Sequence, residues 1–195
     1  MAAARTPRRP GRPAGASTTR AAILDAALGQ FAARGYTTTS IRSIAAAADV
    51  DPSLVTHYFK TKDDLLEACI KDFTSTPMPF LPELQDRGPD AGTRVARAYL
   101  RMWEDPFTGP RLRAVARAAT ESSAAAELLR TALDSLAATH APSAEAARRH
   151  QLALSQLLGA AFARYILKVR PLAEATLEEV SAAVGPGLDT LITGN

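Results

Sequence analysis

Cysteine is almost absent from this chain of 195 residues, and it has no long hydrophobic run. The single cysteine, Cys69, excludes an internal disulfide and fits a reducing compartment. The longest apolar runs are far too short to cross a bilayer. The first residues are basic and proline-rich, but no apolar segment follows them, so they do not resemble a signal peptide. We therefore expect a soluble, cytoplasmic protein with no membrane partner.

Arrangements of residues that carry catalysis are also missing. The three histidines, His57, His140 and His150, are scattered and have no metal-ligand spacing. The sequence contains no phosphate-binding glycine loop and no nucleophile elbow. An all-helical enzyme would need a catalytic constellation that the chain does not offer. We therefore expect a protein without enzymatic activity, metal or cofactor.

Charge is divided unevenly along the chain. Residues 1–62 hold nine lysines and arginines against three acidic residues, a net charge of +6. The other 133 residues hold 14 basic and 17 acidic groups, a net charge of −3. A basic N-terminal third on an acidic remainder indicates a region that binds a polyanion. The alternative is a solvated tail, because four of the basic residues lie in the first 16 positions.

Apolar residues recur with helical spacing along most of the chain, and no alternating strand pattern is present. We therefore expect an all-α fold of about nine helices. A first helix, capped by a hydroxyl residue at 17–19, should end before Gly35, a second short helix should follow, and Pro52 suits the first turn of a third. Further helices are expected near residues 62–75, 91–104, 110–120, 124–139, 143–169 and 176–192, with a kink or break at Pro186.

The third of these helices carries many hydrogen-bonding side chains in a short stretch, SLVTHYFKTK at residues 53–62. Val55 and Phe59 are four residues apart and share an apolar face. A two-turn helix that follows a helix and a tight turn, and whose other face is polar, is typical of a helix-turn-helix that contacts DNA. The alternative is an ordinary amphipathic helix with a solvated face. The polar face consists of Ser53, Thr56, His57 and Lys60.

The order of residues from 37 to 66, TTTSIRSIAAAADVDPSLVTHYFKTKDDLL, resembles the DNA-binding domain of the TetR family of bacterial transcriptional regulators. The likeness extends over about residues 18–66, and YFKTK at 58–62 followed by a leucine is its most specific part. It implies an arm (1–16), a helix-turn-helix DNA-binding domain (17–62) and a ligand-binding and dimerisation domain (63–195). Other matching features are Arg34-Gly35-Tyr36, Ile44-Ala45 and Val50.

The same resemblance implies contacts with double-stranded DNA from the second helix, the third helix and the phosphate clamp that follows. Two residues depart from the family pattern: Thr56 stands where many members have tyrosine, and Asp49 replaces the usual turn glycine, which aspartate can do because it tolerates a positive φ. For His57 the alternative is an exposed histidine with no DNA contact. The implied DNA-binding residues are Ser40, Arg42, Ser53, Thr56, His57, Tyr58, Lys60 and Lys62.

The basic arm offers a second candidate contact with DNA. Its RRPGRP segment, residues 8–13, is similar to an AT-hook core, although Pro10 interrupts that core. Narrow A·T-rich minor grooves attract arginine. A solvated tail is the alternative.

The larger region carries aromatic and aliphatic residues that the resemblance assigns to an apolar inducer pocket among central helices. A plain hydrophobic core is the alternative for the same residues. Residues 103–120 and 155–191 also resemble one C-terminal subtype of the family. The expected lining is Phe73, Tyr99, Trp103, Phe107, Leu112, Val115, Leu128 and Phe162.

The last two long helices are expected to form a four-helix interface between two subunits, because they combine apolar with small residues. A two-fold dimer would present two DNA-binding heads to a near-palindromic operator. The resemblance also implies repression and an apolar inducer, so we expect a homodimeric repressor that a small apolar ligand releases from DNA. A ligand-independent architectural DNA-binding protein is the alternative. The expected interface residues are Leu157, Leu158, Ala161, Phe162, Tyr165, Leu177, Val180, Val184, Leu188 and Leu191.

Overall fold

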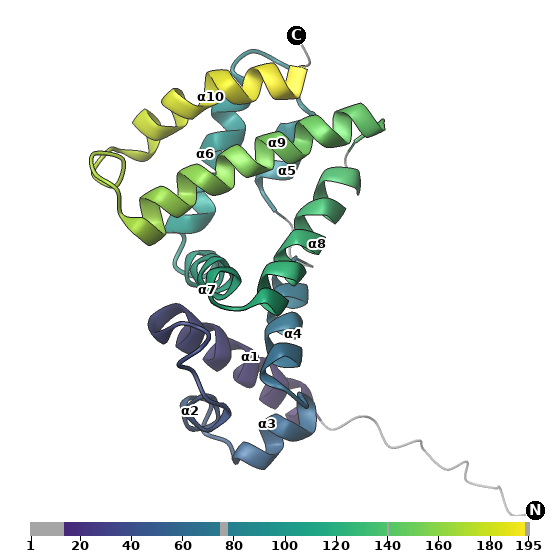
Figure 1. Ribbon diagram of the computed structural model, residues 1–195, viewed down its shortest axis with the longest axis vertical. Helices are drawn as coiled ribbons and strands as arrows, with labels where there is room; N and C mark the ends of the chain where they lie inside the picture. The colour runs from purple at the N-terminus through teal and green to yellow at the C-terminus, as the bar shows by residue number, and fades with distance from the viewer. Residues whose placement is uncertain (1–13, 75–77, 140, 194–195) are drawn as a thin grey trace, which may run out of the picture.

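The computed structural model describes residues 14–74, 78–139 and 141–193, and the fold is all-α, as predicted (Figure 1). Residues 1–13, which include the RRPGRP segment, lie outside the described residues, as does the side chain of Phe73. Residues 14–16, which were expected in the arm, instead form the start of α1, so this helix begins before the hydroxyl residues at 17–19 that were expected to cap it. The described part contains ten α-helices, one π-helical turn and no strand. They are α1 (Ala14–Arg34), α2 (Ile41–Ala47), α3 (Pro52–Tyr58), α4 (Lys62–Thr74), α5 (Phe80–Gln85), α6 (Ala91–Glu104), α7 (Thr108–Glu121), α8 (Ser123–Thr139), α9 (Ala144–Ala161), η1 (Phe162–Leu167) and α10 (Leu177–Thr193).

The short helices α2 and α3 begin and end where the local sequence dictates. Ser40 caps α2 by accepting the Ser43 N–H at 3.1 Å, and the Ser43 hydroxyl accepts the Ser40 N–H in return. Asp51 caps α3, with Pro52 at its first turn. Asp49, in the turn between the two helices, has φ = +54°, as expected from the sequence. These caps fix the angle at which α3 leaves α2.

Two hydrophobic cores divide the molecule. The first joins α1–α4, which we call the head, to α7 and α8; its members from α7 are Ala114, Val115 and Ala118. The second lies within α5–α10, which we call the body. In Figure 1 the helices α1–α3 occupy one end of the molecule, and α9 and α10 cross the other. The head therefore rests on two helices of the body.

The structure departs from the predicted elements at two prolines, Pro82 and Pro186. Helix α5 was not expected, because prolines surround it; Pro82 falls in its first turn, where a helix needs no N–H donor. Helix α10 continues through Pro186 without a break. At that level α10 packs closely against α6, since a Cβ on Gly92 would lie 2.2 Å from the Gly185 carbonyl oxygen. Tertiary packing thus preserves a helix that the local sequence would interrupt.

Candidate DNA-binding face and ligand cavity

The polar face of α3 is exposed and its apolar face is buried, as predicted. Val55 is fully buried in the first core, whereas Ser53, Thr56 and His57 are exposed. The Ser53 hydroxyl donates to Asp51 Oδ1 at 2.5 Å, and the Thr56 hydroxyl donates to the Ser53 carbonyl at 2.9 Å. Both hydroxyls therefore keep acceptor lone pairs, and the His57 ring adds two nitrogen atoms that can form hydrogen bonds on the same face.

The flanking residues predicted to contact DNA have different surroundings. Arg42 on α2 and Lys60 after α3 are exposed. Ser40 is exposed but uses its hydroxyl to cap α2. Tyr58 is half-buried, and the edge of its ring meets His57 at 5.6 Å between centroids. Arg42 and Lys60 are thus accessible at the surface, while Ser40 and Tyr58 also contribute to the local fold.

Lys62 lies at the start of α4, where it binds the loop that follows α1. Its ammonium donates to the carbonyls of Tyr36 at 2.8 Å, Thr39 at 3.1 Å and Thr37 at 3.4 Å. It also lies 4.3 Å from the centre of the Tyr36 ring. Three carbonyls occupy all three donors of an ammonium group. In this arrangement Lys62 positions the loop before α2 instead of facing outward, a role that its place in the sequence did not reveal.

Tyr36 is held from the other side by the first acidic residue of α4. Its hydroxyl donates to Asp63 Oδ1. Burial, together with this hydrogen bond to a carboxylate, raises the pKa of Tyr36 well above its usual range. The loop between α1 and α2 is therefore tied to α4 through both Lys62 and Asp63.

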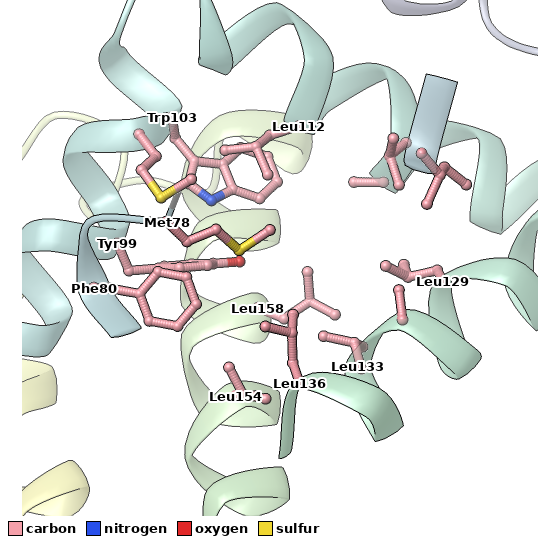
Figure 2. Close-up of a pocket in the computed structure, with 15 residues that line it drawn as sticks. Met78, Phe80, Tyr99, Trp103, Leu112, Leu129, Leu133, Leu136, Leu154 and Leu158 are labelled. Atoms are coloured by element: carbon pink, nitrogen blue, oxygen red, sulfur yellow. The ribbon is translucent and has the colours of Figure 1, made fainter. Parts of the chain in front are cut away.

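A cavity of about 70 Å³ lies between the two cores, and its lining is almost wholly apolar (Figure 2). Aromatic residues and methionines from α5, α6 and the segment before α5 form one side, and leucines of α8 and α9 form the other. Phe80, Tyr99 and Trp103 follow one another with ring centroids 5.4 and 6.2 Å apart. The lining residues are Ile70, Met78, Phe80, Tyr99, Met102, Trp103, Leu112, Val115, Ala116, Leu129, Ala132, Leu133, Leu136, Leu154 and Leu158.

Four of the residues expected to form a pocket line this cavity: Tyr99, Trp103, Leu112 and Val115. Three others lie outside it. Phe107 precedes α7, is 61% exposed, and packs under the Arg111 guanidinium at 3.6 Å. Leu128 packs against the first core without lining the cavity, because one residue along a helix turns its side chain by about 100° from that of Leu129, which contacts both.

Phe162 is the third residue that lies outside the cavity, since it packs against the second core at the start of η1. The lining residues that sequence reasoning missed come mainly from two places. Met78 and Phe80 belong to the proline-rich connection, which gave no helical pattern. Leu129, Leu133 and Leu136 recur at helical spacing on α8, so that their periodicity could have identified them.

Comparison with known proteins relates both the N-terminal and the C-terminal part of the chain to the same family. Residues 23–69 match the family of bacterial regulatory proteins described as the tetR family, and residues 90–192 match the tetracyclin repressor-like C-terminal domain. The chain belongs to the TetR family. Its N-terminal helices are thus the helix-turn-helix domain of that family, and the family assignment from the sequence is confirmed.

Individual relatives of this TetR-family regulator agree. The transcriptional repressor Rv3405c of Mycobacterium tuberculosis is 48% identical over 95 residues, which cover 45% of this chain and 50% of the relative. A TetR-family regulator of Streptomyces coelicolor is 30% identical, with a TM-score of 0.65 over 94% of this chain and 99% of its own. A structure from a Rhodococcus species gives a TM-score of 0.69 at 19% identity, covering 90% of this chain and 99% of its own. The chain thus aligns with about half the length of its curated relative.

The described residues of this TetR-family regulator were also compared with the features of membrane and metal-binding proteins. They contain no helix that is long and apolar enough to cross a membrane. Nor do they contain a group of three or more histidine, cysteine or acidic side chains placed to hold a metal ion.

Cys69 is buried. Burial, and to a smaller extent the nearby Asp72 and Asp25 carboxylates, raise the pKa of its thiol to about 12. It is therefore a core residue and not a nucleophile.

Helix α7 connects the cavity with the head of this TetR-family regulator. Leu112 and Val115 face the cavity, and three polar residues of the same helix contact α1 and the loop after it. Arg111 pairs with Asp25, Arg117 donates to the Ala32 carbonyl at 3.0 Å, and Glu121 accepts the Thr37 N–H at 2.8 Å. The Glu121 carboxylate also lies against Gly35, where a Cβ would be 2.5 Å from Glu121 Oε1; the φ of +86° at this position independently favours glycine. Any shift of α7 therefore reaches the head at three points.

Proposed function

We propose that this TetR-family regulator is a homodimeric transcriptional repressor that an apolar small molecule releases from a near-palindromic operator. The observation that carries the proposal is a shared wall. Ile70 of α4 and Val115 of α7 line the cavity and also belong to the core of the head. An occupant of the cavity would thus press directly on the residues that hold the DNA-binding helices.

The small size of the cavity supports a mechanism in which a ligand displaces helices and thereby releases the protein from DNA. Pockets for small molecules usually measure about 300–1,000 Å³, several times the 70 Å³ found in this conformation. A larger occupant must therefore move a wall, and close-packed protein interiors respond to such a change by shifting whole helices. A ligand acts as an inducer only if it binds the shifted state more tightly than the DNA-competent one.

Repression is supported by the relative Rv3405c, which is named a transcriptional repressor and is 48% identical over the matched 95 residues. The family's helix-turn-helix domain supports DNA binding, with Arg42, His57 and Lys60 exposed on one domain. A test compares a duplex taken from upstream of the protein's own gene with a shuffled duplex. We expect binding tighter by about 10³-fold or more to the first. Equal affinities would favour the architectural alternative.

The dimer is proposed to form through the outer surfaces of α9 and α10. Of the ten apolar residues expected there from the sequence, four are buried inside the chain and six are half-buried; Leu157 and Leu188 are fully buried in the second core. The opposite faces remain available, because Leu152 is 53% exposed and Gly159 and Gly187 are exposed and small. Leu152→Glu should convert a dimer into monomers in analytical ultracentrifugation. A protein that stays dimeric with this substitution would place the interface elsewhere.

The coupling of cavity and head can be tested without knowing the ligand. Ala132 of α8 lines the cavity, whereas Ala124 near the start of the same helix is exposed. Ala132→Leu should act as a built-in occupant and weaken operator binding, and Ala124→Leu should leave it unchanged. If Ala132→Leu folds and binds the operator like the unmodified protein, filling the cavity does not control the head.

A further inference from the structure

The cavity contains one polar group that has nothing to bind. Trp103 is 1% exposed, and its Nε1 has no hydrogen-bond partner among the described residues. The neighbouring Tyr99 hydroxyl interacts with this N–H, which offsets part of the rise that burial causes in the Tyr99 pKa, but the two groups do not reach hydrogen-bond geometry. Buried donors are satisfied in most proteins, and leaving one unpaired is unfavourable. Such a donor at a cavity wall is therefore a feature that a bound molecule would relieve.

The rest of the lining restricts what that molecule can be. None of the described residues that line the cavity is charged, and burying an ion without a partner is very unfavourable. The ligand must therefore be uncharged. An indole N–H can only donate, so the ligand must carry an acceptor atom. Burial raises the pKa of Tyr99 and keeps its hydroxyl protonated, so it adds a second hydrogen-bonding group on the same side.

The opposite side of the cavity determines the other end of the ligand. Figure 2 shows Trp103 and Tyr99 together on one side, and leucines such as Leu133, Leu136 and Leu154 facing them. Leucine side chains offer only apolar contact. The cavity surface is thus hydrocarbon almost throughout, and the Trp103 N–H and the Tyr99 hydroxyl are polar groups buried within its aromatic wall.

We propose that the ligand is an uncharged molecule with a hydrocarbon body and a carbonyl or similar acceptor oxygen that binds the Trp103 indole N–H. This inference rests on the proposed function, because it names the chemical class of the molecule that would occupy the cavity. It makes Trp103 the residue that selects an oxygen-bearing ligand over a pure hydrocarbon.

The test uses two probes of the same shape, methyl hexyl ketone and its analogue in which C=CH₂ replaces C=O. Trp103 is the only tryptophan, so isotopically labelled protein gives one indole cross-peak in a proton–nitrogen correlation spectrum. The ketone should move the indole proton downfield, and the alkene should not. After correction for their different partition into oil, the ketone should bind about 2- to 10-fold more tightly, the contribution of one hydrogen bond. Trp103→Phe should remove that advantage while both probes still bind.

Similar shifts of the indole proton with both probes, or affinities that follow hydrophobicity alone, would overturn the inference while leaving the cavity as a ligand site. Failure of both probes to bind would overturn it together with the ligand-dependent part of the proposed function. The spectrum of the unmodified protein decides the question even if Trp103→Phe fails to fold. Operator binding is measured separately in the presence of each probe. A ketone that hydrogen-bonds Trp103 but does not release DNA would uphold the inference and count against induction.

Discussion

Replacing Lys62 with methionine should destabilise the head without removing a phosphate contact. The resemblance to the TetR family implied that Lys62 binds phosphate, but its ammonium is bound to the carbonyls of Tyr36, Thr37 and Thr39. Methionine keeps much of the length of the lysine side chain and removes the charge and the donors. The substitution therefore tests whether these internal bonds or a contact with DNA explain why a lysine stands at this position.

The structure bounds the size of the effect. A hydrogen bond to a charged group contributes about 1.5–3 kcal/mol. The Tyr36 carbonyl would keep a second bond, from the Thr39 N–H at 3.3 Å, and the loop at Thr37 is exposed to water. We therefore expect a loss near the lower end, about 2 kcal/mol. At about 2–4 °C per kcal/mol for a chain of this size, the midpoint of thermal unfolding should fall by roughly 4–8 °C.

Lys60 provides the matched control, since it lies two residues away and is exposed. Lys60→Met should leave the midpoint unchanged and reduce the slope of log K against log salt by about 0.9, the value for one lost phosphate contact. Lys62→Met should lower the midpoint and leave the slope unchanged. Fluorescence anisotropy at several salt concentrations and differential scanning calorimetry measure the two quantities. A Lys62→Met protein that unfolds at the normal temperature but loses about 0.9 in slope would refute the positioning role.

Three further predictions concern other parts of the molecule. His57→Ala should cost about 1–3 kcal/mol at particular base positions and little on shuffled DNA; a uniform loss in a binding-site selection assay would exclude base recognition. Cys69 should resist thiol reagents at pH 8 until the protein unfolds, because burial raises the pKa of its thiol to about 12. Mass spectrometry that finds the reagent attached to Cys69 in the folded protein would contradict this prediction. Gly92→Ala should destabilise the protein by about 1–3 kcal/mol through its clash with the Gly185 carbonyl. Gly29→Ala, on an open part of α1, should be neutral or stabilising in the same denaturation assay.

Local sequence features were enough to predict most of the head, although not the residue at which α1 begins. Helix caps, the glycine after α1 and the aspartate in the turn each act within a few residues, so their effects could be read without knowing the tertiary structure. Asp49 and Gly35 adopt the positive φ values that this reasoning requires. The polar face of α3 followed from the spacing of Val55 and Phe59 for the same reason.

The cavity was harder to predict, because periodicity shows that a helix has an apolar face but not which core that face meets. Leu128 and Leu129 are adjacent in the sequence and both pack against the head's core, yet only Leu129 also lines the cavity. Phe107 is aromatic, as many pocket residues are, but it lies in the connection between α6 and α7 and its side chain is exposed. The partners of Lys62 lie 23 to 26 residues earlier in the chain, a distance at which only the folded structure brings groups together.

The position of the cavity explains why a small occupant could control a distant DNA-binding surface in the proposed regulator. Ile70 and Val115 give the occupant direct contact with α4 and α7. Helix α4 begins at Lys62, which holds the loop before α2, and α7 ends at Glu121, which binds the same loop at Thr37. Two helices therefore run from the cavity to one loop, and that loop positions α2 and α3. A ligand that separates α4 from α7 would move apart the two points at which these helices hold the loop. The ligand would thereby favour the DNA-incompetent arrangement of the head, by a free energy equal to the difference between its binding free energies for the two arrangements.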